Sequence, residues 1–319
     1  MADPYRVWLS EIMLQQTTVT AVLPYYRAFL ARFPSVALLA AADEAEVMAA
    51  WAGLGYYARA RNLHACARLV AAAGGFPRDL PGLRALPGIG PYTAMAVAAI
   101  AFGVPGVPVD GNVERVAARV FAIGEALPAA RPGIAQAAAR LGAQAEAVAR
   151  PSDFAQALFD LGATICTPAA PACGICPWLA GCAGRREGIA AELPRKAAKA
   201  VRPVRHGIAF WLTDAEGRVL LRRRPPRGLL GGMTELPGTP WRAAIWESDD
   251  WPAYAPMAAH WRAAGEVRHV FTHFELRLGV LAAAVPDIRA EGFLRDVAAL
   301  DGEALPSLMR KCVALAQAS

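Results

Sequence analysis

The stretch LRALPGIGPYTAMAVAAIAF, residues 83–102, indicates how the first half of the chain folds. Two segments of helical composition meet at Pro87–Gly90, and Pro91 stands at the first position of the second segment, as helix stop and start rules require. The second segment is predicted to be a buried core helix that ends at Gly103. Such a tight turn aims backbone N–H groups at one point, beside the positive end of the following helix dipole. The stretch therefore predicts either an anion site or a plain helix–helix turn.

Composition narrows the class of protein. The chain has 319 residues, 55% of them hydrophobic, which suggests two domains that each bury a core. A formal net charge of +6 suits a polyanionic partner. No secretory signal is visible, and Gly and Pro interrupt the longest apolar run, residues 93–109, so no membrane span is expected. We expect a soluble, cytosolic protein whose six cysteines are thiols.

The spacing of apolar residues changes along the chain and indicates two domains joined by a linker. Residues 1–190 read as helices separated by Gly and Pro stops, and residues 191–204 read as an exposed basic linker. Residues 205–319 are predicted to be an α+β domain, because apolar residues there alternate with a period of two.

The α+β prediction rests on three segments. Residues 206–224 predict two strands around a turn at 214–217, and residues 266–285 predict a second strand pair. Residues 305–317 predict a short helix.

Four cysteines form a compact group with the spacing C-x6-C-x2-C-x5-C: Cys166, Cys173, Cys176 and Cys182. Four thiolates within 17 residues suit either a zinc ion or an iron–sulfur cluster. Four unrelated buried thiols are the plainer alternative. Cys66 and Cys312 lie in apolar helical contexts and are predicted to fill cores.

The cysteine spacing, with FAQALFDLGATIC (residues 154–166) before it, resembles the [4Fe–4S] motif of the endonuclease III/MutY superfamily of DNA glycosylases. The L-P-G-x-G turn resembles that superfamily's helix–hairpin–helix. The resemblance implies a [4Fe–4S] cluster on the four cysteines, distant from the chemistry, and a hairpin whose Gly88 and Gly90 grip the DNA backbone.

The resemblance assigns catalytic roles to two acidic residues, Glu11 and Asp110. WLSEIMLQQTTV, residues 8–19, is predicted to be one helix with Glu11 at the margin of its apolar stripe, where a solvated helix edge is the plainer interpretation. Asp110, in PVDGNVERVAAR, is either a turn and helix cap or the superfamily's catalytic aspartate. The resemblance implies that Glu11, its pKa raised by an apolar setting, protonates the leaving adenine, while Asp110 stabilises the sugar cation.

Tyr92 stands where bifunctional relatives carry the lysine that forms a Schiff base with the sugar. A phenol cannot form that bond, so a monofunctional glycosylase of the MutY branch is predicted. The resemblance also matches Gln16 to the wedge that fills the vacated stack, with Thr17 beside it. It matches Tyr56 to a stacking position and Gln156 to a position facing the adenine, whereas Tyr57 is predicted to be core packing.

The C-terminal half resembles the Nudix-like domain of MutY. Phe271, Thr272 and His273 are similar to the family's F-S-H motif, which senses 8-oxoguanine, although a buried strand would also explain them. PWRAAIWESDDW, residues 240–251, lacks the R-E-x-x-E-E pattern that holds magnesium in working Nudix hydrolases. Recognition rather than nucleotide hydrolysis is therefore predicted for this domain.

These observations together predict a multidomain protein, with an all-α helix–hairpin–helix glycosylase domain carrying a [4Fe–4S] cluster, then an α+β Nudix-like domain. It would excise adenine opposite 8-oxoguanine or guanine, as a monomer on double-stranded DNA, in the cytoplasm or at the nucleoid. An endonuclease III-like lyase and a non-catalytic lesion binder are the alternatives. Relatives carry an L-P-W-R segment before DPYRVWLSE (residues 3–11) that closes the adenine pocket. We expect that the chain start is truncated or mis-assigned, or that part of the pocket is lost.

Overall fold

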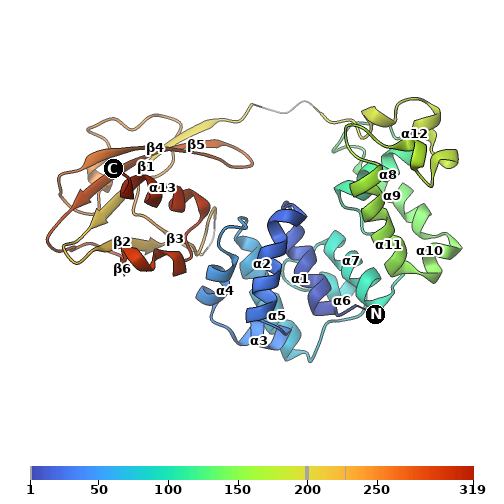
Figure 1. The fold of residues 1–319 in the computed structure, drawn as a ribbon, viewed down its shortest axis with the longest axis horizontal. Coiled ribbons are helices and arrows are strands. Elements are labelled where there is room, and N and C mark those ends of the chain that lie inside the picture. The colour runs from blue at the N-terminus through green and yellow to red at the C-terminus, as the bar shows by residue number, and fades with distance from the viewer. Residues whose placement is uncertain (1, 198–200, 227) are drawn as a thin grey trace. The chain divides into compact units, whose positions relative to one another are not determined.

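A computed structural model describes residues 2–197, 201–226 and 228–319 (Figure 1). Among these residues, contacts define a first unit of residues 2–26, 30–41 and 62–197, and a second unit of residues 27–29, 42–61, 201–226 and 228–319. The α-helices are α1 (Pro4–Leu14), α2 (Val19–Arg32), α3 (Val36–Ala41), α4 (Glu44–Trp51), α5 (Ala58–Ala72), α6 (Leu80–Arg84), α7 (Pro91–Phe102), α8 (Gly111–Val120), α9 (Arg131–Gly142), α10 (Ala145–Ala149), α11 (Pro151–Asp160), α12 (Ala183–Arg186) and α13 (Ser307–Gln317). The helical character predicted for the N-terminal half is confirmed. The predicted domain bounds themselves stay a prediction.

Helix α1 begins and ends for local reasons. Asp3 caps its start by accepting a 2.9 Å hydrogen bond from the Tyr5 N–H, and Pro4 occupies the first helical position. The helix ends at Leu14, and Gln16 takes a left-handed φ of 57° before α2 begins. The prediction of one helix over residues 8–19 is therefore wrong. Val19, the last residue of that predicted helix, is 67% exposed on the next helix.

Helix α7 is the centre of the first unit, where it packs against α1, α6 and α11. It is buried along most of its length, and five of its buried residues are alanines, whose small side chains allow close packing. The helix is followed by Gly103, which has a left-handed φ of 67°. The core helix predicted to end at Gly103 is thus confirmed. In the turn before it, Gly88 has a φ of 75°, which favours glycine, and an added Cβ would lie 2.8 Å from the Asn62 Cβ.

Helix α8 carries the second half of the first unit. It packs against α9, α11 and α12, and it contacts a π-helical turn, Leu161–Ile165, that directly precedes the first clustered cysteine. The turn approaches α8 closely because position 162 is glycine, where an added Cβ would lie 2.6 Å from the Asn112 Cβ. The segment at residues 190–196, which includes the first six residues of the predicted linker, is also held against α8, because Arg119 donates to the Leu193 carbonyl. Leu193 there is only 2% exposed.

The second unit contains a mixed sheet of β1 (Val204–Thr213), β2 (Arg218–Arg223), β3 (Thr234–Glu235), β4 (Arg262–Val270), β5 (Glu275–Ala284) and β6 (Phe293–Asp296). Its strand order is β3-β2-β1-β5-β4, and β6 also pairs with β2. Strands β1 and β5 run parallel in an unbroken register from Val204↔Glu275 to Thr213↔Ala284. Helix α13 packs against this sheet over a core that includes Leu276, Leu308 and Cys312.

The predicted strand pairs and C-terminal helix are confirmed, as are the buried positions of Cys66 and Cys312. Within the described ranges, we find no helix with both the length and the apolar character needed to cross a bilayer.

Candidate active site

Two predicted catalytic residues meet where α1 packs on α7. The Tyr92 hydroxyl, from the first turn of α7, donates a 2.6 Å hydrogen bond to Oε2 of Glu11. Glu11 lies on the buried side of α1 and is only 8% exposed, so the prediction of a margin position understated its burial. The Tyr92 ring is tilted against Phe159 of α11, with centroids 6.4 Å apart. The carboxyl is therefore held by one donor inside an apolar setting.

The environment favours the protonated form of Glu11. Burial raises the pKa of this carboxyl, the hydrogen bond from Tyr92 partly offsets that rise, and the charge of Asp110 raises the pKa further. Burial and the neighbouring Glu11 also raise the pKa of the Tyr92 phenol far above its ordinary value. Tyr92 thus stays a hydrogen-bond donor, and Glu11 is the member of the pair that exchanges a proton.

Asp110 is the N-cap of α8. Its carboxylate accepts hydrogen bonds from the Val113 N–H at 2.8 Å and from Nδ2 of Asn112 at 3.0 Å. The interpretation as a helix cap is therefore confirmed, and it is compatible with catalysis because an anion is stabilised at a helix N-terminus. Capping also fixes the orientation of the carboxylate.

Arg115 connects this end of α8 to the cysteine segment. Its Nη2 donates to Oδ1 of Asn112 at 2.8 Å and to the Gly162 carbonyl at 2.6 Å, while Nε donates to the Cys166 carbonyl at 2.7 Å. Asn112, which donates to the Asp110 carboxylate, is therefore linked through the Arg115 guanidinium to the backbone of Cys166.

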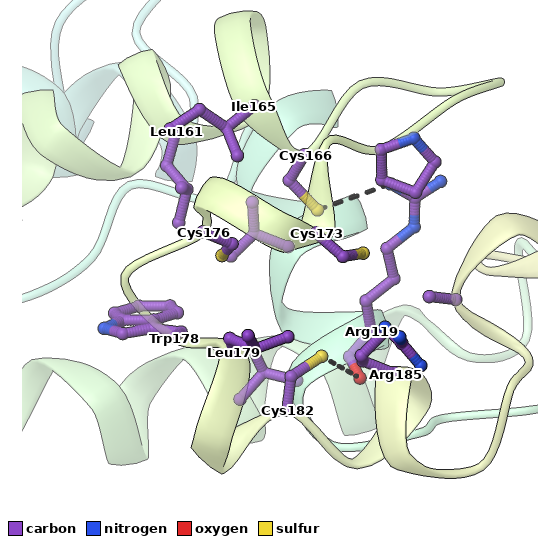
Figure 2. A pocket seen from close by; sticks show the side chains of 14 residues that line it. Arg119, Leu161, Ile165, Cys166, Cys173, Cys176, Trp178, Leu179, Cys182 and Arg185 are labelled. Carbon is purple, nitrogen blue, oxygen red and sulfur yellow. Dashed lines mark hydrogen bonds between the residues drawn. The ribbon is translucent and has the colours of Figure 1, made fainter.

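The four clustered cysteines line one cavity, as Figure 2 shows. Its remaining walls are largely apolar, and they include Leu161, Ile165, Trp178 and Leu179. Within the described part of the chain, no three His, Cys, Asp or Glu side chains are placed to hold one metal ion. Four thiols around an apolar cavity are a suitable donor set for an iron–sulfur cluster.

Arg119 closes one side of this cavity from α8, although it is 1% exposed. Its Nη1 donates to Sγ of Cys166 at 3.3 Å (Figure 2). The same Nη1 donates to the Thr167 carbonyl at 2.7 Å. Nη2 donates to the Pro168 carbonyl at 2.8 Å, and Nε donates to the Leu193 carbonyl at 2.9 Å. A buried guanidinium with four acceptors holds the cysteine loop and the 190–196 segment together.

The predicted DNA-contacting residues of the first unit occupy separate positions. Gly88 and Gly90 form the turn before α7, and Gly90 is the N-cap of that helix. Gln16 is exposed in the α1–α2 turn, and Thr17 Oγ1 donates to the Gln15 carbonyl in the same turn. Gln156 is exposed on α11, with its amide bonded to Ser152 of its own helix.

The predicted contacts of the second unit lie in turns. Tyr56 is 48% exposed with a φ of 49°, whereas Tyr57 is buried as predicted. Phe271, Thr272 and His273 form the turn between β4 and β5, so the alternative of a buried strand is wrong. A turn is required because β4 and β5 pair as an antiparallel hairpin from Val270↔Glu275 onwards.

Within that turn, the Phe271 ring stacks on Trp241 with centroids 5.6 Å apart and planes at 30°. Thr272 and His273 are exposed, and the hydroxyls of Thr272 and Tyr56 lie 3.3 Å apart within the second unit. The turn therefore exposes the side chains of Thr272 and His273, while Phe271 packs on Trp241 beneath them.

Sequence reasoning missed the roles of Arg115, Arg119 and the 190–196 segment. Arg115 and Arg119 are four residues apart on α8 and therefore lie on the same face of the helix, among valines and alanines. Two arginines on a largely apolar helix indicate buried hydrogen-bonding roles, and this was the signal available in the sequence. Nothing local in the sequence indicated that Leu193 would pack back onto α8.

The fold and site define a class of protein. Residues 9–139 match the HhH-GPD superfamily of base excision DNA repair proteins, and residues 208–315 match the NUDIX domain. A solved structure of a thermostable thymine-DNA glycosylase is similar, with a TM-score of 0.51 and 29% identity over 59% of this chain and 86% of that chain.

Curated relatives narrow the family. The chain is 31% identical to the adenine DNA glycosylase of Schizosaccharomyces pombe, over 89% of this chain and 73% of that protein. It is 36% identical to the human adenine DNA glycosylase, over 88% of this chain and 61% of that protein. The chain belongs to the adenine DNA glycosylase family. It spans about three fifths of the length of its human, mouse and rat relatives, at 61%, 64% and 64%.

Proposed function

We propose that the protein is a monofunctional adenine DNA glycosylase that removes adenine mispaired with 8-oxoguanine or guanine, starting base excision repair. The observation that carries the proposal is the buried Glu11 carboxyl, bonded to the Tyr92 hydroxyl at 2.6 Å and influenced by the charge of Asp110. Two carboxyl groups in different environments can divide the work of glycosidic cleavage.

In this mechanism, Glu11 donates its proton to the leaving adenine, which becomes a neutral leaving group. Tyr92 orients the carboxyl and keeps its own proton throughout. Asp110, fixed by its bonds to Val113 and Asn112, places negative charge beside the sugar as positive charge develops on it. Water then adds at C1′ and leaves an abasic site.

DNA must be held while the base is extruded from the stack. The turn at Gly88–Gly90 with the N-terminus of α7 provides a backbone surface suited to phosphate. Gln16, exposed at a left-handed position, is suited to enter the duplex as a wedge, with Thr17 beside it and Tyr56 stacking. Gln156 is assigned to the adenine, which requires it to release Ser152 when substrate binds.

The cysteine cavity fits a [4Fe–4S] cluster, which would be held by Cys166, Cys173, Cys176 and Cys182. Such a cluster would supply a rigid, charged centre that shapes the surrounding loops. The chain's own contribution is Arg119, whose guanidinium donates to the first of these sulfurs and to the backbone around it.

Recognition of the base opposite adenine is assigned to Phe271, Thr272 and His273 in the second unit. The Thr272 hydroxyl can donate or accept a hydrogen bond, and Phe271 is braced by Trp241. We expect the protein to act as a monomer on duplex DNA in the cytoplasm, and at the nucleoid if its source is a bacterium.

The test measures abasic-site formation, under single-turnover conditions, in duplexes with adenine opposite 8-oxoguanine, guanine or thymine. Excision opposite the first two bases supports the proposal, and intact adenine in all three duplexes refutes it. Thr272→Val removes the hydroxyl at nearly constant shape and should reduce the preference for 8-oxoguanine over guanine. Thr272→Ser keeps the hydroxyl and is the matched control.

A further inference from the structure

The recognition turn, residues 271–273, depends on a support that lies outside it. The Phe271 N–H donates to the Phe274 carbonyl at 2.9 Å and closes the turn. The Phe271 ring stacks on Trp241 and makes an edge contact with His269, with centroids 4.6 Å apart. The side chain of Thr272 is exposed, so the position of its hydroxyl depends on how Phe271 is held.

The Trp241 indole is seated against strand β1. A Cβ added at Gly207 would lie 2.6 Å from Cδ1 of Trp241, so the indole fills the space of that missing side chain. The backbone beside it is fixed, because His206 and Arg242 exchange N–H to carbonyl hydrogen bonds at 2.7 and 3.0 Å. A tryptophan side chain still turns about two bonds, and backbone bonds do not set those angles. The orientation of the ring is therefore set by the side chains that contact it.

Arg224 supplies one of these contacts. Its guanidinium lies over the Trp241 ring, 5.2 Å from the centroid. The guanidinium is itself fixed, because Nη1 donates to Oε2 of Glu235 and Nε donates to the Leu229 carbonyl at 3.1 Å. Glu235 is only 4% exposed, so the arginine is anchored in the interior of the second unit. A fixed cation thus contacts the aromatic ring on which Phe271 stacks.

Arg222 shares the same anchor but not the contact with the indole. Its Nε donates to Oε1 of Glu235 at 2.8 Å, and its Nη2 donates to the Gly238 carbonyl at 3.4 Å. Within the described ranges, its guanidinium lies over neither Trp241 nor a ring of the recognition turn. The two arginines therefore differ in their relation to the turn while they bind one carboxylate.

We propose that Arg224 is a positioning residue for recognition of the base opposite adenine, acting through Trp241 and Phe271 on the Thr272 hydroxyl. The inference rests on the proposed function, which assigns that base to the recognition turn. Hydrogen bonds weaken steeply when donor and acceptor are misaligned, so a hydroxyl on a loosened turn discriminates less between two bases. Arg224 thus contributes to the preference for 8-oxoguanine over guanine through other side chains.

The test compares two duplexes that carry 8-oxoguanine or guanine opposite 2′-fluoro-2′-deoxyadenosine, whose fluorine resists glycosidic cleavage. The ratio of their dissociation constants measures recognition without requiring excision. Arg224→Gln removes the cation from Trp241 and leaves Glu235 paired with Arg222, so the ratio should fall about three- to tenfold, the contribution of one well-placed hydrogen bond. Arg222→Gln removes a cation from the same carboxylate and is the matched control, which should leave the ratio unchanged.

Substitutions at Trp241 test the same link from its other end. Trp241→Leu keeps apolar bulk without the flat ring and should lower the ratio by a similar factor, whereas Trp241→Phe keeps an aromatic ring and should retain most of it. Combining Trp241→Leu with Arg224→Gln should add little further loss, because both residues act along one set of contacts. Denaturant unfolding checks that each variant folds, and Arg224→Met, which keeps the aliphatic length, replaces Arg224→Gln if the latter does not.

Equal losses of preference in Arg224→Gln and Arg222→Gln would overturn the inference, because the effect would then belong to the pairing of Glu235. Wild-type ratios in Arg224→Gln, or additive losses in the double variant, would overturn it as well. Equal binding of both duplexes by the wild type defeats this inference together with the recognition role of the turn. Discrimination between the duplexes without any excision of ordinary adenine defeats the proposed function alone.

Discussion

Replacing Glu11 by Gln separates the chemical role of this residue from its structural role. The amide has nearly the same shape as the carboxyl, and its Oε1 can still accept the hydrogen bond from Tyr92. Only the transferable proton is lost. A general acid typically contributes about 10²–10⁴ in rate, so single-turnover excision should fall by about that factor, a barrier increase of about 3–5 kcal/mol.

The same substitution should stabilise the fold at neutral pH. Burial raises the pKa of Glu11 above the value of about 4.3 typical of an unfolded chain, so between these two pKa values the folded state holds more protons. The free energy of unfolding of the wild type therefore falls as pH rises through this window and stays reduced above it. Glu11→Gln has no such loss, and chemical denaturation at pH 7 should find it more stable than the wild type.

Excision by the wild type should also decline as pH rises through the elevated pKa of Glu11, because the acid form is consumed. Glu146→Gln, an exposed position on α10, is the matched control and should change neither rate nor stability. Excision at the wild-type rate by a folded, DNA-binding Glu11→Gln protein would refute the assignment of the proton donor.

Three further predictions test the supports of the site. Asp110→Asn keeps a good helix cap and should melt close to the wild-type temperature, while single-turnover excision falls about 10²–10³-fold; an unaffected rate contradicts its role. Arg119→Lys leaves buried carbonyls without donors, so the free energy of unfolding in denaturant should fall by about 2–4 kcal/mol. The purified variant should also contain less iron and absorb less visible light. Wild-type iron content and wild-type stability would contradict the bridging role of Arg119. Gly88→Ala forces a left-handed alanine against Asn62 and should cost at least about 1–2 kcal/mol and weaken DNA binding. Gly90→Ala, at an ordinary φ with no protein atom near the added Cβ, should be nearly neutral in stability, and an equal loss of stability there would contradict the strain assigned to Gly88.

Features governed by neighbouring residues could be predicted from the sequence. Pro91 and Gly103 bound α7 as stop and start rules require, and the turn at residues 214–217 joins two strands. Asp110 illustrates a partial success, because its capping role was readable from its neighbours. Its proximity to Glu11 was not, since no local rule relates residues almost one hundred positions apart.

The failures also have physical reasons. The residues around Gln16 suit a helix by composition, and only the left-handed φ there shows where α1 ends. Phe271 alternates with His273 as in a strand, but the antiparallel register of β4 and β5 requires a turn at that point. The packing of Leu193 depends on Arg119, whose partners are contributed by two distant segments, the cysteine loop and the segment at residues 190–196.

The bonds of Arg119 also constrain the order of events while the chain is being made. The arginine emerges early, yet its acceptors at Thr167 and Leu193 are synthesised 48 and 74 residues later. Until Leu193 is available, the cavity side of α8 carries a charged group without its full set of partners. The first strand, β1, begins only at Val204. We therefore expect a nascent chain to become competent to accept the proposed cluster after Leu193 is available and before β1 begins at Val204.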